Sequence, residues 1–433
     1  MSEKRDYIIV GARVVDPANG VDEIRDIGVA DGLFADPAKV RGPVRLDFKG
    51  LVASPGFIDM HVHLRQPGGA DAETIRSGTM AAAAGGFTTI VAMPNTKPCA
   101  DSVGTIEYIR RHTAAEALVN VLPTGTITKG MEGKEMSGIG GLKRAGVVAL
   151  TDDGNCVQDN ELMRHVLEYS KSFNLPVLDH CQDASLSAGG VAHDGFWGAL
   201  TGLRGIPSAA EDIIVARNII LAHATGHKIH IQHVSSRESV LMLRHALQRR
   251  IPVSAEATPH HIALTDECVR DFDTNYKMNP PLRSEEDRLA IVEGLMDNTI
   301  AVIATDHAPH TDTAKLVEFA YAPFGVIGLE TAVPVCLTEL CRNCGMGLSQ
   351  LVAKFTLGPA SVLNLGIGRI ADGLKADLTI LDLEKDHLVD ADKFRSKSRN
   401  TAFDGYQAKG KAVATMVAGR FVFSELPGVE ERL

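Results

Sequence analysis

The stretch SPGFIDMHVHLRQPG, residues 54–68, runs from a short apolar strand directly into His61, His63 and Arg65. Side chains two residues apart on a strand project to the same face, so we expect these three to point together at the strand's C-terminal end. Two imidazoles and a guanidinium on one face predict a metal site beside a group that binds an anion. A His-x-His pair alone is weak evidence, and the interpretation depends on the rest of the chain.

Seven more apolar runs follow before residue 311, with longer segments between them. In order, the eight runs are GFIDMHVH, FTTIVAMPN, ALVNVLPTG, GVVALTDDG, LPVLDHCQD, HKIHIQHVSS, IPVSAEATPHH and NTIAVIATDHAPH. Several intervening segments, such as ELMRHVLEYSKSF (161–173) and ESVLMLRHALQRR (238–250), have the 3.6-residue period of a helix. Near-continuous apolar strands alternating with helices are typical of a parallel sheet. Eight such units predict a TIM-type (β/α)8 barrel, in the α/β class.

The two ends of the chain have a different pattern. Residues 1–53 contain YIIVGARVVDP and VDEIRDIGVADGLF, and residues 368–433 contain DLTILDLEKDHLV and AVATMVAGRFVFS. These are short strand-like runs separated by turn residues, and the termini of a domain often lie close together. We therefore expect a small composite β-domain, built from residues 1–53 and 368–433, beside a catalytic barrel of residues 54–367.

The bulk composition is that of a soluble globular protein with a large core rather than a nucleic-acid or membrane protein. The chain has 433 residues, 45% hydrophobic and 23% charged, with a net charge of −10. An acidic balance argues against nucleic acid as a partner, and no apolar run reaches the ~18 residues of a membrane span. Seven cysteines, an odd number, do not indicate a disulfide framework, and the lone C-x-x-C of Cys341 and Cys344 is more typical of a helix end than of a zinc site. The start of the chain lacks the pattern of a signal peptide, so we expect a cytoplasmic protein.

Polar residues follow the apolar runs one after another. They are His61 and His63, then Asn95, Asp153, His180, His233 and Asp306. In a barrel these positions converge on the mouth at the C-terminal ends of the strands, where barrel enzymes keep their active sites. Asp152 competes with Asp153 for this position, but neighbouring strand residues face opposite ways and only one can point into the mouth.

Four histidines and two aspartates from different strands suit two divalent metal ions, and imidazole with carboxylate ligands favours zinc. His61, His63 and Asp153 would hold the first ion, and Asp153, His180 and His233 the second. A hydroxide shared by the two ions would be the nucleophile, because zinc lowers the pKa of bound water to about 7. Asp306, after the last strand, would take the proton of this hydroxide and pass it to a leaving nitrogen.

Several stretches of the sequence resemble the dihydroorotase family of the amidohydrolase superfamily. They include GFIDMHVHLRQPG, AMPNTKP, TDDG, HCQD, QHVSS, EATPHH, KMNPPLR, ATDHAPHT, APFGVIGLET and SKSRNTAFDGYQAKGKAV. The resemblance runs over essentially the whole chain. It implies a metal-dependent barrel with a small β-domain, and the reversible hydrolysis of (S)-dihydroorotate to N-carbamoyl-L-aspartate in pyrimidine biosynthesis.

The resemblance also implies roles for individual residues. It makes His61, His63, Asp153, His180 and His233 the metal ligands and Asp306 the catalytic acid/base. Arg65, Asn95 and His310 would grip the substrate carboxylate, whereas Asn279 and the backbone of Phe324 and Gly325 would contact the ring amides. His260 and His261 are not zinc ligands in this pattern, and a structural role is expected for them.

One departure concerns the bridge between the two metals. Many superfamily members use a carboxylated lysine at the fourth strand, but GVVALTDDG (146–154) contains no lysine and the nearest preceding one is Lys143. An aspartate bridge, as in the longer bacterial dihydroorotases, is the physical substitute. We expect two zinc ions per chain, and the short bridge leaves the occupancy of the second position open.

Two other readings compete with a dihydroorotase. Dihydropyrimidinases, hydantoinases and allantoinases share the barrel and much of the metal set, but a dihydropyrimidine lacks the carboxylate that Arg65 and His310 would bind. An inactive structural homologue would typically lose ligands, whereas this chain keeps all six. The expected partner is the small-molecule substrate, and a homodimer or a complex with another pyrimidine-pathway enzyme is compatible with this reading. Residues 311–323 read equally as a lid or as a surface loop.

Overall fold

The computed structural model describes residues 5–429. Its centre is a ring of parallel strands, in which β8 (Phe57–Val62), β9 (Phe87–Ala92) and β10 (Asn120–Pro123) form one sheet. A second sheet contains β11 (Val177–Asp179), β14 (Ile229–Ile231), β15 (Val253–Ala257) and β16 (Val302–Ile303). Isolated parallel bridges join the two sheets, through Leu150 on one side and from Val62 to His307 on the other. The ring therefore closes, and the expected (β/α)8 barrel is confirmed.

The fourth strand is the irregular member of the ring. Leu150 forms parallel bridges with Gly125 and Val177, but no strand is assigned there. Backbone hydrogen bonds still join this segment to both neighbouring strands: Val148 N donates to Pro123 O at 3.0 Å, and Leu178 N donates to Leu150 O at 2.8 Å. The segment breaks off quickly because Asp152 turns back to bind the preceding loop.

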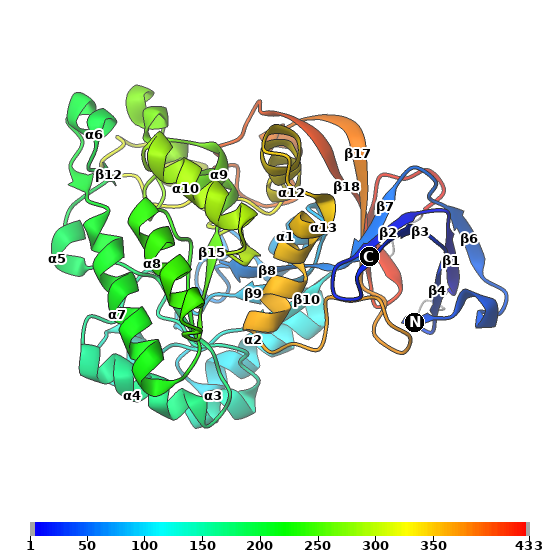
Figure 1. Ribbon diagram of the computed structural model, residues 1–433, viewed down its shortest axis with the longest axis horizontal. Helices are drawn as coiled ribbons and strands as arrows, with labels where there is room; N and C mark the ends of the chain where they lie inside the picture. Colours follow the sequence, from blue (N-terminus) through cyan, green and yellow to red (C-terminus); the bar gives the residue numbers. More distant parts are fainter. Residues whose placement is uncertain (1–4, 430–433) are drawn as a thin grey trace.

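Helices surround the barrel, as Figure 1 shows. The longer ones are α1 (Ile75–Ala84), α2 (Val103–Glu116), α3 (Ile139–Ala145), α4 (Asn160–Lys171), α7 (Ala209–Thr225), α8 (Arg237–Gln248), α10 (Glu285–Met296) and α13 (Leu348–Phe355). The shorter ones are α5 (Ala184–Ser187), α6 (Phe196–Thr201), α9 (Pro259–Ala263), α11 (Asp312–Lys315), α12 (Ala332–Cys336), α14 (Leu357–Val362), the π-helix Leu337–Asn343, and 3-10 turns at Pro37–Lys39, Lys129–Met131, Asp266–Asp271, Thr274–Tyr276 and Ala391–Lys393. No helix within residues 5–429 is both long and apolar enough to cross a membrane.

Both ends of the chain build the β-domain at the right of Figure 1. One sheet has the order β5 (Leu33–Ala35), β4 (Ile27–Ala30), β1 (Tyr7–Val10) and β6 (Val44–Asp47). The other has the order β19 (Arg420–Ser424), β18 (Gln407–Val417), β17 (Leu378–Leu388), β7 (Val52–Pro55), β2 (Arg13–Asp16) and β3 (Val21–Ile24). Tyr7 packs edge-on against Phe421 at 5.6 Å, so the two ends share one core.

The domain boundary expected between residues 53 and 54 falls inside β7, whose four residues all pair with β17. The long hairpin of β17 and β18 reaches out of the β-domain and packs on α12 and α1 of the barrel. An additional pair of short strands, β12 (Ala192–His193) and β13 (Gly205–Ile206), flanks α6 in an excursion that the strand pattern did not predict.

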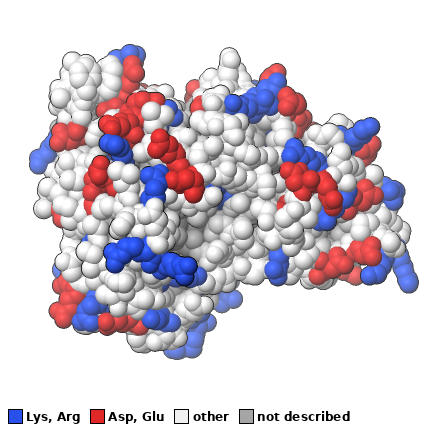
Figure 2. Space-filling model, viewed as in Figure 1, with Lys and Arg blue, Asp and Glu red and all other residues white. Residues whose placement is uncertain are grey.

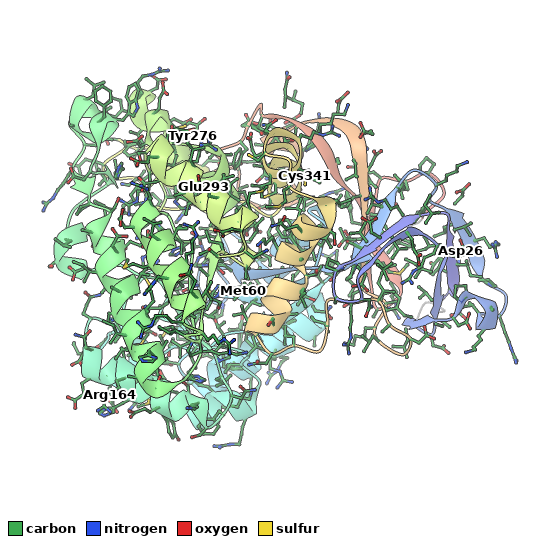
Figure 3. All side chains as sticks on the ribbon, viewed as in Figure 1. Asp26, Met60, Arg164, Tyr276, Glu293 and Cys341 are labelled. Carbon is green, nitrogen blue, oxygen red and sulfur yellow. The ribbon has the colours of Figure 1, made fainter. Side chains whose placement is uncertain are left out.

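The inside of the barrel is apolar at one end. Met60, near the centre of Figure 3, packs with Val91, Ala149, Leu178 and Val302, each from a different strand segment. Side chains from five segments can meet only inside the ring. These residues therefore fill the inside of the barrel below the mouth that the C-terminal ends of the strands form. On the outer face seen in Figure 2, acidic and basic residues are interspersed over the barrel helices and the β-domain rather than gathered into one tract.

Candidate active site

The inward face of the strands leads directly to the site. Leu178, His230 and Ser254 are register partners on β11, β14 and β15, and Leu178 belongs to the inner core. Alternation therefore places His180 and Glu256, each two residues further along its strand, inside the mouth as well.

Three site residues have left-handed backbone conformations. The φ angles are +58° at Arg65, +31° at His233 and +48° at Asp306. Non-glycine residues rarely adopt this region, which costs on the order of 1 kcal/mol or more each and is typical of functional sites. At His233 the turn redirects the side chain, because His230 points inward beside Leu178 and strict alternation would send residue 233 to the other face.

The predicted ligands converge on Asp153. Its Oδ1 lies 3.2 Å from His61 Nε2 and its Oδ2 lies 3.4 Å from His63 Nε2. The same carboxylate lies 3.8 Å from His233 Nε2 and 3.9 Å from His180 Nδ1. All five side chains are buried. One carboxylate thus stands between two pairs of histidines, which is the arrangement expected of a bridging ligand.

Asp152 points away from this cluster. Its carboxylate accepts hydrogen bonds from Ile127 N at 2.8 Å and from the backbone and hydroxyl of Thr128. Burial raises the pKa of Asp152 to about 6, and the bonds from Thr128 and Ile127 oppose that rise. Asp152 therefore anchors the loop after β10, and the choice of Asp153 over Asp152 agrees with the geometry.

Hydrogen bonds on the outer side of the histidines fix which nitrogen faces inward. His61 Nδ1 lies 2.6 Å from Glu256 Oε1, His63 Nδ1 lies 2.8 Å from Asn95 Oδ1, and His180 Nε2 lies 2.7 Å from Gln182 Oε1. Because each oxygen can only accept, each ring donates its outer N–H and keeps a lone pair on the inner nitrogen. An inward lone pair is what a metal ligand requires.

The inner nitrogen of His61 is the clearest sign that the site suits a cation. His61 Nε2 is buried without a hydrogen-bond partner, 3.2 Å from Asp153 and 3.4 Å from Asp306. Burial alone lowers the pKa of His61, but Asp153 and Asp306 raise it well above its usual value, so this point in the site favours positive charge. The donor sets His61–His63–Asp153, Asp153–His180–His233 and His61–His233–Asp306 each lie close enough to hold one ion. The residues therefore fit divalent metals.

Asp306 faces the same centre. Its Oδ1 lies 3.0 Å from His63 Nε2. Burial favours the neutral acid, but His61 and His63 hold the pKa of Asp306 below its usual value, so the group is ionised at neutral pH.

Arg65 and His310 lie together beside the metal ligands. Arg65 Nε donates to Pro309 O at 3.0 Å, and Arg65 Nη2 lies 3.5 Å from His310 Nε2. Burial and the neighbouring Arg65 lower the pKa of His310 to about 3, so its ring is neutral. The pair thus presents one fixed positive charge and one neutral ring toward the mouth.

Of the remaining residues predicted to contact the substrate, Asn95 lies beside His63, whereas Asn279 and Phe324 lie near His180 and His310. Asn95 uses its oxygen to orient His63, which leaves its amide nitrogen to donate to an anion. Asn279 Nδ2 donates to Gln182 Oε1 at 2.6 Å, and His310 Nε2 donates to Phe324 O at 2.8 Å. Asn279 and Phe324 also line a cavity of about 510 Å³ beside His180, which is large enough for a small ring.

Residues 311–323 are held by two buried lysines. Lys315 Nζ donates to the carbonyls of Thr274 at 3.0 Å and Pro323 at 2.9 Å. Lys277 Nζ donates to Phe319 O at 2.8 Å and lies 4.7 Å from the centre of the Phe324 ring. Burial lowers the pKa of Lys315 to about 7 and that of Lys277 to about 8. The loop that carries Phe324 is therefore tied to the segment before Asn279.

Sequence reasoning missed two buried residues beneath the site. Glu256 Oε1 binds His61, and its Oε2 lies 3.1 Å from His230 Nε2. Burial raises the pKa of Glu256, but His61 and His230 outweigh it and bring the pKa to about 2. An acidic residue within the apolar strand IPVSAEA was the available signal. His260 Nε2 is also buried without a hydrogen-bond partner, while His261 bonds Thr258 and Pro280 O.

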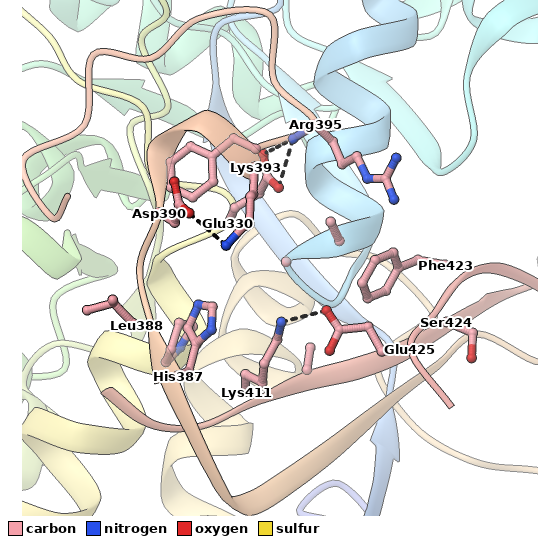
Figure 4. Close-up of a pocket in the computed structure, with 15 residues that line it drawn as sticks. Glu330, His387, Leu388, Asp390, Lys393, Arg395, Lys411, Phe423, Ser424 and Glu425 are labelled. Carbon is pink, nitrogen blue, oxygen red and sulfur yellow. Dashed lines mark hydrogen bonds and ion pairs between the residues drawn. The ribbon is translucent and has the colours of Figure 1, made fainter. Parts of the chain in front are cut away.

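A second cavity, of about 350 Å³, lies between the barrel and the β17–β18 hairpin (Figure 4). Glu330 there accepts hydrogen bonds from Arg395 N at 2.8 Å and Ser396 N at 3.0 Å, and Lys411 pairs with Glu425 at 2.7 Å. None of the predicted site residues lines this cavity.

Comparisons with known proteins place the chain among its relatives. A "Dihydro-orotase-like" family model matches residues 50–239. Proteins named dihydroorotase from Pelotomaculum thermopropionicum and Solibacter usitatus are 47% and 45% identical to this chain, each over 96% of it and 98% of the relative. Among solved structures, L-hydantoinase from Arthrobacter aurescens covers 100% of this chain and 98% of its own with a TM-score of 0.89 at 24% identity. Dihydropyrimidinase from Brevibacillus agri covers 97% and 95% with a TM-score of 0.84 at 20% identity.

The chain shares its barrel and composite β-domain with these solved structures, and its histidine–aspartate cluster offers donor sets that can hold a metal ion. The solved structures support this fold alone, because their sequences differ widely from this one. The sequence relatives are much closer and cover nearly the whole chain. The chain belongs to the dihydroorotase family, as its motifs indicated.

Proposed function

We propose that the chain catalyses the dihydroorotase reaction, the reversible hydrolysis of dihydroorotate to N-carbamoyl-L-aspartate in pyrimidine biosynthesis. The observation that carries this proposal is the position of Arg65 and His310, 3.5 Å apart, beside a cluster of histidines and aspartates suited to metal. Such a site combines hydrolytic chemistry with a grip for an anion. Dihydroorotate is a cyclic amide that carries a carboxylate.

We assign the metal ligands as in the sequence analysis. His61, His63 and Asp153 would hold one zinc ion, and Asp153, His180 and His233 the other. The inward lone pairs of His61, His63 and His180, fixed by their outer hydrogen bonds, support this assignment. Bound zinc supplies Lewis acidity, which lowers the pKa of water and polarises a carbonyl oxygen.

Asp306 would move the proton. It faces the cluster from the end of β16 and is ionised at neutral pH, so it can accept a proton as water adds to the amide carbonyl. The same carboxyl then donates that proton to the ring nitrogen as the C–N bond breaks. In the reverse direction, protonated Asp306 would help the carboxylate oxygen leave as water.

The substrate grip distinguishes this reaction from that of the structural neighbours. Arg65 would pair with the substrate carboxylate, and the Asn95 amide would add a hydrogen bond. The His310 ring would add another by turning its Nε2–H from Phe324 O to the carboxylate. Asn279 and the backbone of Phe324 and Gly325 would contact the ring amides. A dihydropyrimidine without a carboxylate would leave Arg65 without its anion, which disfavours hydantoinase or dihydropyrimidinase activity.

Turnover of dihydroorotate and dihydrouracil by the purified, zinc-loaded protein tests this proposal. The protein should use dihydroorotate and use dihydrouracil poorly. Arg65→Met should lower kcat/KM for dihydroorotate by an amount equivalent to roughly 2–5 kcal/mol, the cost of removing one partner of a buried charge pair. Rates on dihydrouracil should change little, and equal use of both substrates by the parent protein would contradict the assignment.

A further inference from the structure

A line of hydrogen bonds crosses the inside of the barrel from the candidate metal cluster to its opposite end. Glu256 binds His61 Nδ1 through one oxygen at 2.6 Å and His230 Nε2 through the other at 3.1 Å. His230 Nδ1 in turn lies 2.8 Å from Ser254 Oγ. Glu256, His230 and His61 are each at most 1% exposed.

The last member of this line reaches a different cavity. Ser254 is partly exposed and helps to line a cavity of about 400 Å³ with Lys228, Asn298 and Lys354. Ser254 is the second residue of β15, and Glu256 lies two residues further along the strand, nearer the mouth. Ser254 and His230 therefore hold the Glu256 carboxylate from the end of the barrel opposite the mouth, where none of the predicted substrate contacts lies.

The chemistry of one carboxylate fixes the direction of every bond in the line. Ionised Glu256 can only accept, so His61 donates its Nδ1–H and His230 donates its Nε2–H. His230 then has a lone pair on Nδ1, which accepts the Ser254 hydroxyl proton. Both imidazoles are held in a single tautomer, and the tautomer of His61 leaves Nε2 free to bind a metal.

Burying a carboxylate costs more free energy than burying a neutral amide, which could also accept the hydrogen bond of a histidine. The negative charge of Glu256 therefore calls for a role. The other three histidines of the cluster offer a contrast: His63 and His180 bind the neutral amides of Asn95 and Gln182, and His233 faces His180. Only His61 has an anionic partner on its outer nitrogen among the hydrogen bonds in residues 5–429. A carboxylate there raises the basicity of the imidazole more than an amide can.

We propose that Glu256, braced by His230 and Ser254, is a positioning residue that fixes the His61 tautomer and strengthens metal binding on the His61–His63 side of the cluster. This inference rests on the metal ligands assigned under the proposed function. Neither Glu256 nor His230 touches the substrate, and both act only through His61.

Zinc affinity, measured by competition with a chromophoric chelator, tests the proposal in two backgrounds. His180→Ala removes the second metal position and His63→Ala removes the first. Adding Glu256→Gln, which keeps the shape but loses the charge and one acceptor, should lower zinc affinity ~10–100-fold in the His180→Ala background. In the His63→Ala background the loss should be several times smaller. Glu330→Gln is the matched control, because it changes a carboxyl that accepts hydrogen bonds from two backbone N–H groups in a cavity lined by none of the predicted site residues. It should change neither affinity.

His230 provides a second, independent variant. His230→Phe fills the space but leaves Glu256 with one partner, so zinc affinity should fall less than with Glu256→Gln, and again only in the His180→Ala background. Combining the two changes should cost no more than Glu256→Gln alone, because His230 acts through Glu256. Circular dichroism of the metal-free variants checks the fold. If Glu256→Gln does not fold, the zinc affinity of His230→Phe in the two backgrounds tests the proposal instead.

Equal losses in the two backgrounds, or losses no greater than those of Glu330→Gln, would overturn the proposal. A parent protein that binds zinc and turns over dihydroorotate, while Glu256→Gln and His230→Phe keep full affinity, would defeat this inference alone. A parent that binds zinc with the expected variant pattern but does not turn over dihydroorotate would defeat the proposed function alone.

Discussion

Asp306 illustrates how one residue acquires its role from the backbone. It follows β16 with a φ of +48°, which turns its carboxylate toward His63 at 3.0 Å. Alternation after Val302 and Ala304, which point into the barrel, already directs position 306 inward. The left-handed turn therefore sets how the carboxylate meets His63, not which face of the strand it occupies.

Replacing Asp306 tests its role as proton carrier. Asp306→Asn keeps the shape but removes the base, so hydrolysis and cyclisation should both fall by about 10²–10⁴-fold, the usual share of general acid–base catalysis. Zinc content, measured by elemental analysis, should remain within twofold of the parent. Because His61 and His63 hold the pKa of Asp306 below its usual value, the parent should lose hydrolytic activity from protonation of this group only below the usual range of a carboxyl. Near-normal turnover with intact zinc would show that the proton carrier is another residue.

Individual site residues could be predicted to different degrees. His61, His63, Asp153, His180 and His233 follow apolar runs, so barrel topology brings them to one end of the ring. Strand alternation accounts for the direction of His180, whereas His233 also needs a left-handed turn that the sequence does not indicate. Glu256 and His230 were missed because they lie inside apolar runs, where a polar residue is recognised only once its register partner is known. His230 meets Glu256 across two strands, and no local pattern records that pairing.

At the scale of elements, the loop 311–323 was undecided between lid and surface loop. The structure ties it down with Lys315 and Lys277, whose ammonium groups donate to carbonyls on both sides. Sequence could not predict this, because a lysine in a polar loop ordinarily extends into water. The irregular fourth strand was likewise predicted as a strand, since its apolar run does not reveal that Asp152 turns back to Thr128.

The buried lysine predicts how the loop responds to pH. The pKa of Lys315 is about 7 in the fold against 10.5 in an exposed chain, so between these values the open loop binds the proton and the closed loop does not. The closed state therefore gains stability as pH rises through this window, by up to ~1.4 kcal/mol per pH unit, and gains nothing below it. Hydrogen exchange of amides in residues 311–323, corrected for intrinsic rates, should show this rise in opening free energy.

Lys315→Met is the matched variant for this prediction. It removes the group that titrates first and keeps an apolar chain of similar length, so its opening free energy should be nearly independent of pH between 7 and 8. Above pH 8 a smaller rise should remain, because Lys277, with a pKa of about 8, also bonds the loop through Phe319 O. Parallel pH profiles for parent and variant would exclude Lys315 as the cause.

At the scale of the whole molecule, the barrel and the composite β-domain were predictable because their signals are long-range repetitions. Eight apolar runs with polar ends specify the barrel, and matching strand patterns at both ends specify the shared sheet. The exact partition was harder: the boundary placed at residue 53 divides β7, since β7 leads straight into β8 without a loop to mark the change. The division into residues 1–53, 54–367 and 368–433 remains a proposal.

The separation between site and core predicts what metal removal does to the molecule. The lower barrel core around Met60 and the β-domain core around Phe421 contain none of the metal ligands, so the metal-free protein should keep its far-UV circular dichroism. It should nevertheless lose dihydroorotate turnover, and readdition of zinc should restore it. Zinc should also stabilise the fold by mass action, by about 2.7 kcal/mol when free zinc is 100 times its dissociation constant. His180→Ala and His233→Ala should lower zinc content toward one ion per chain, whereas full activity after exhaustive chelation would rule out a metal-dependent mechanism.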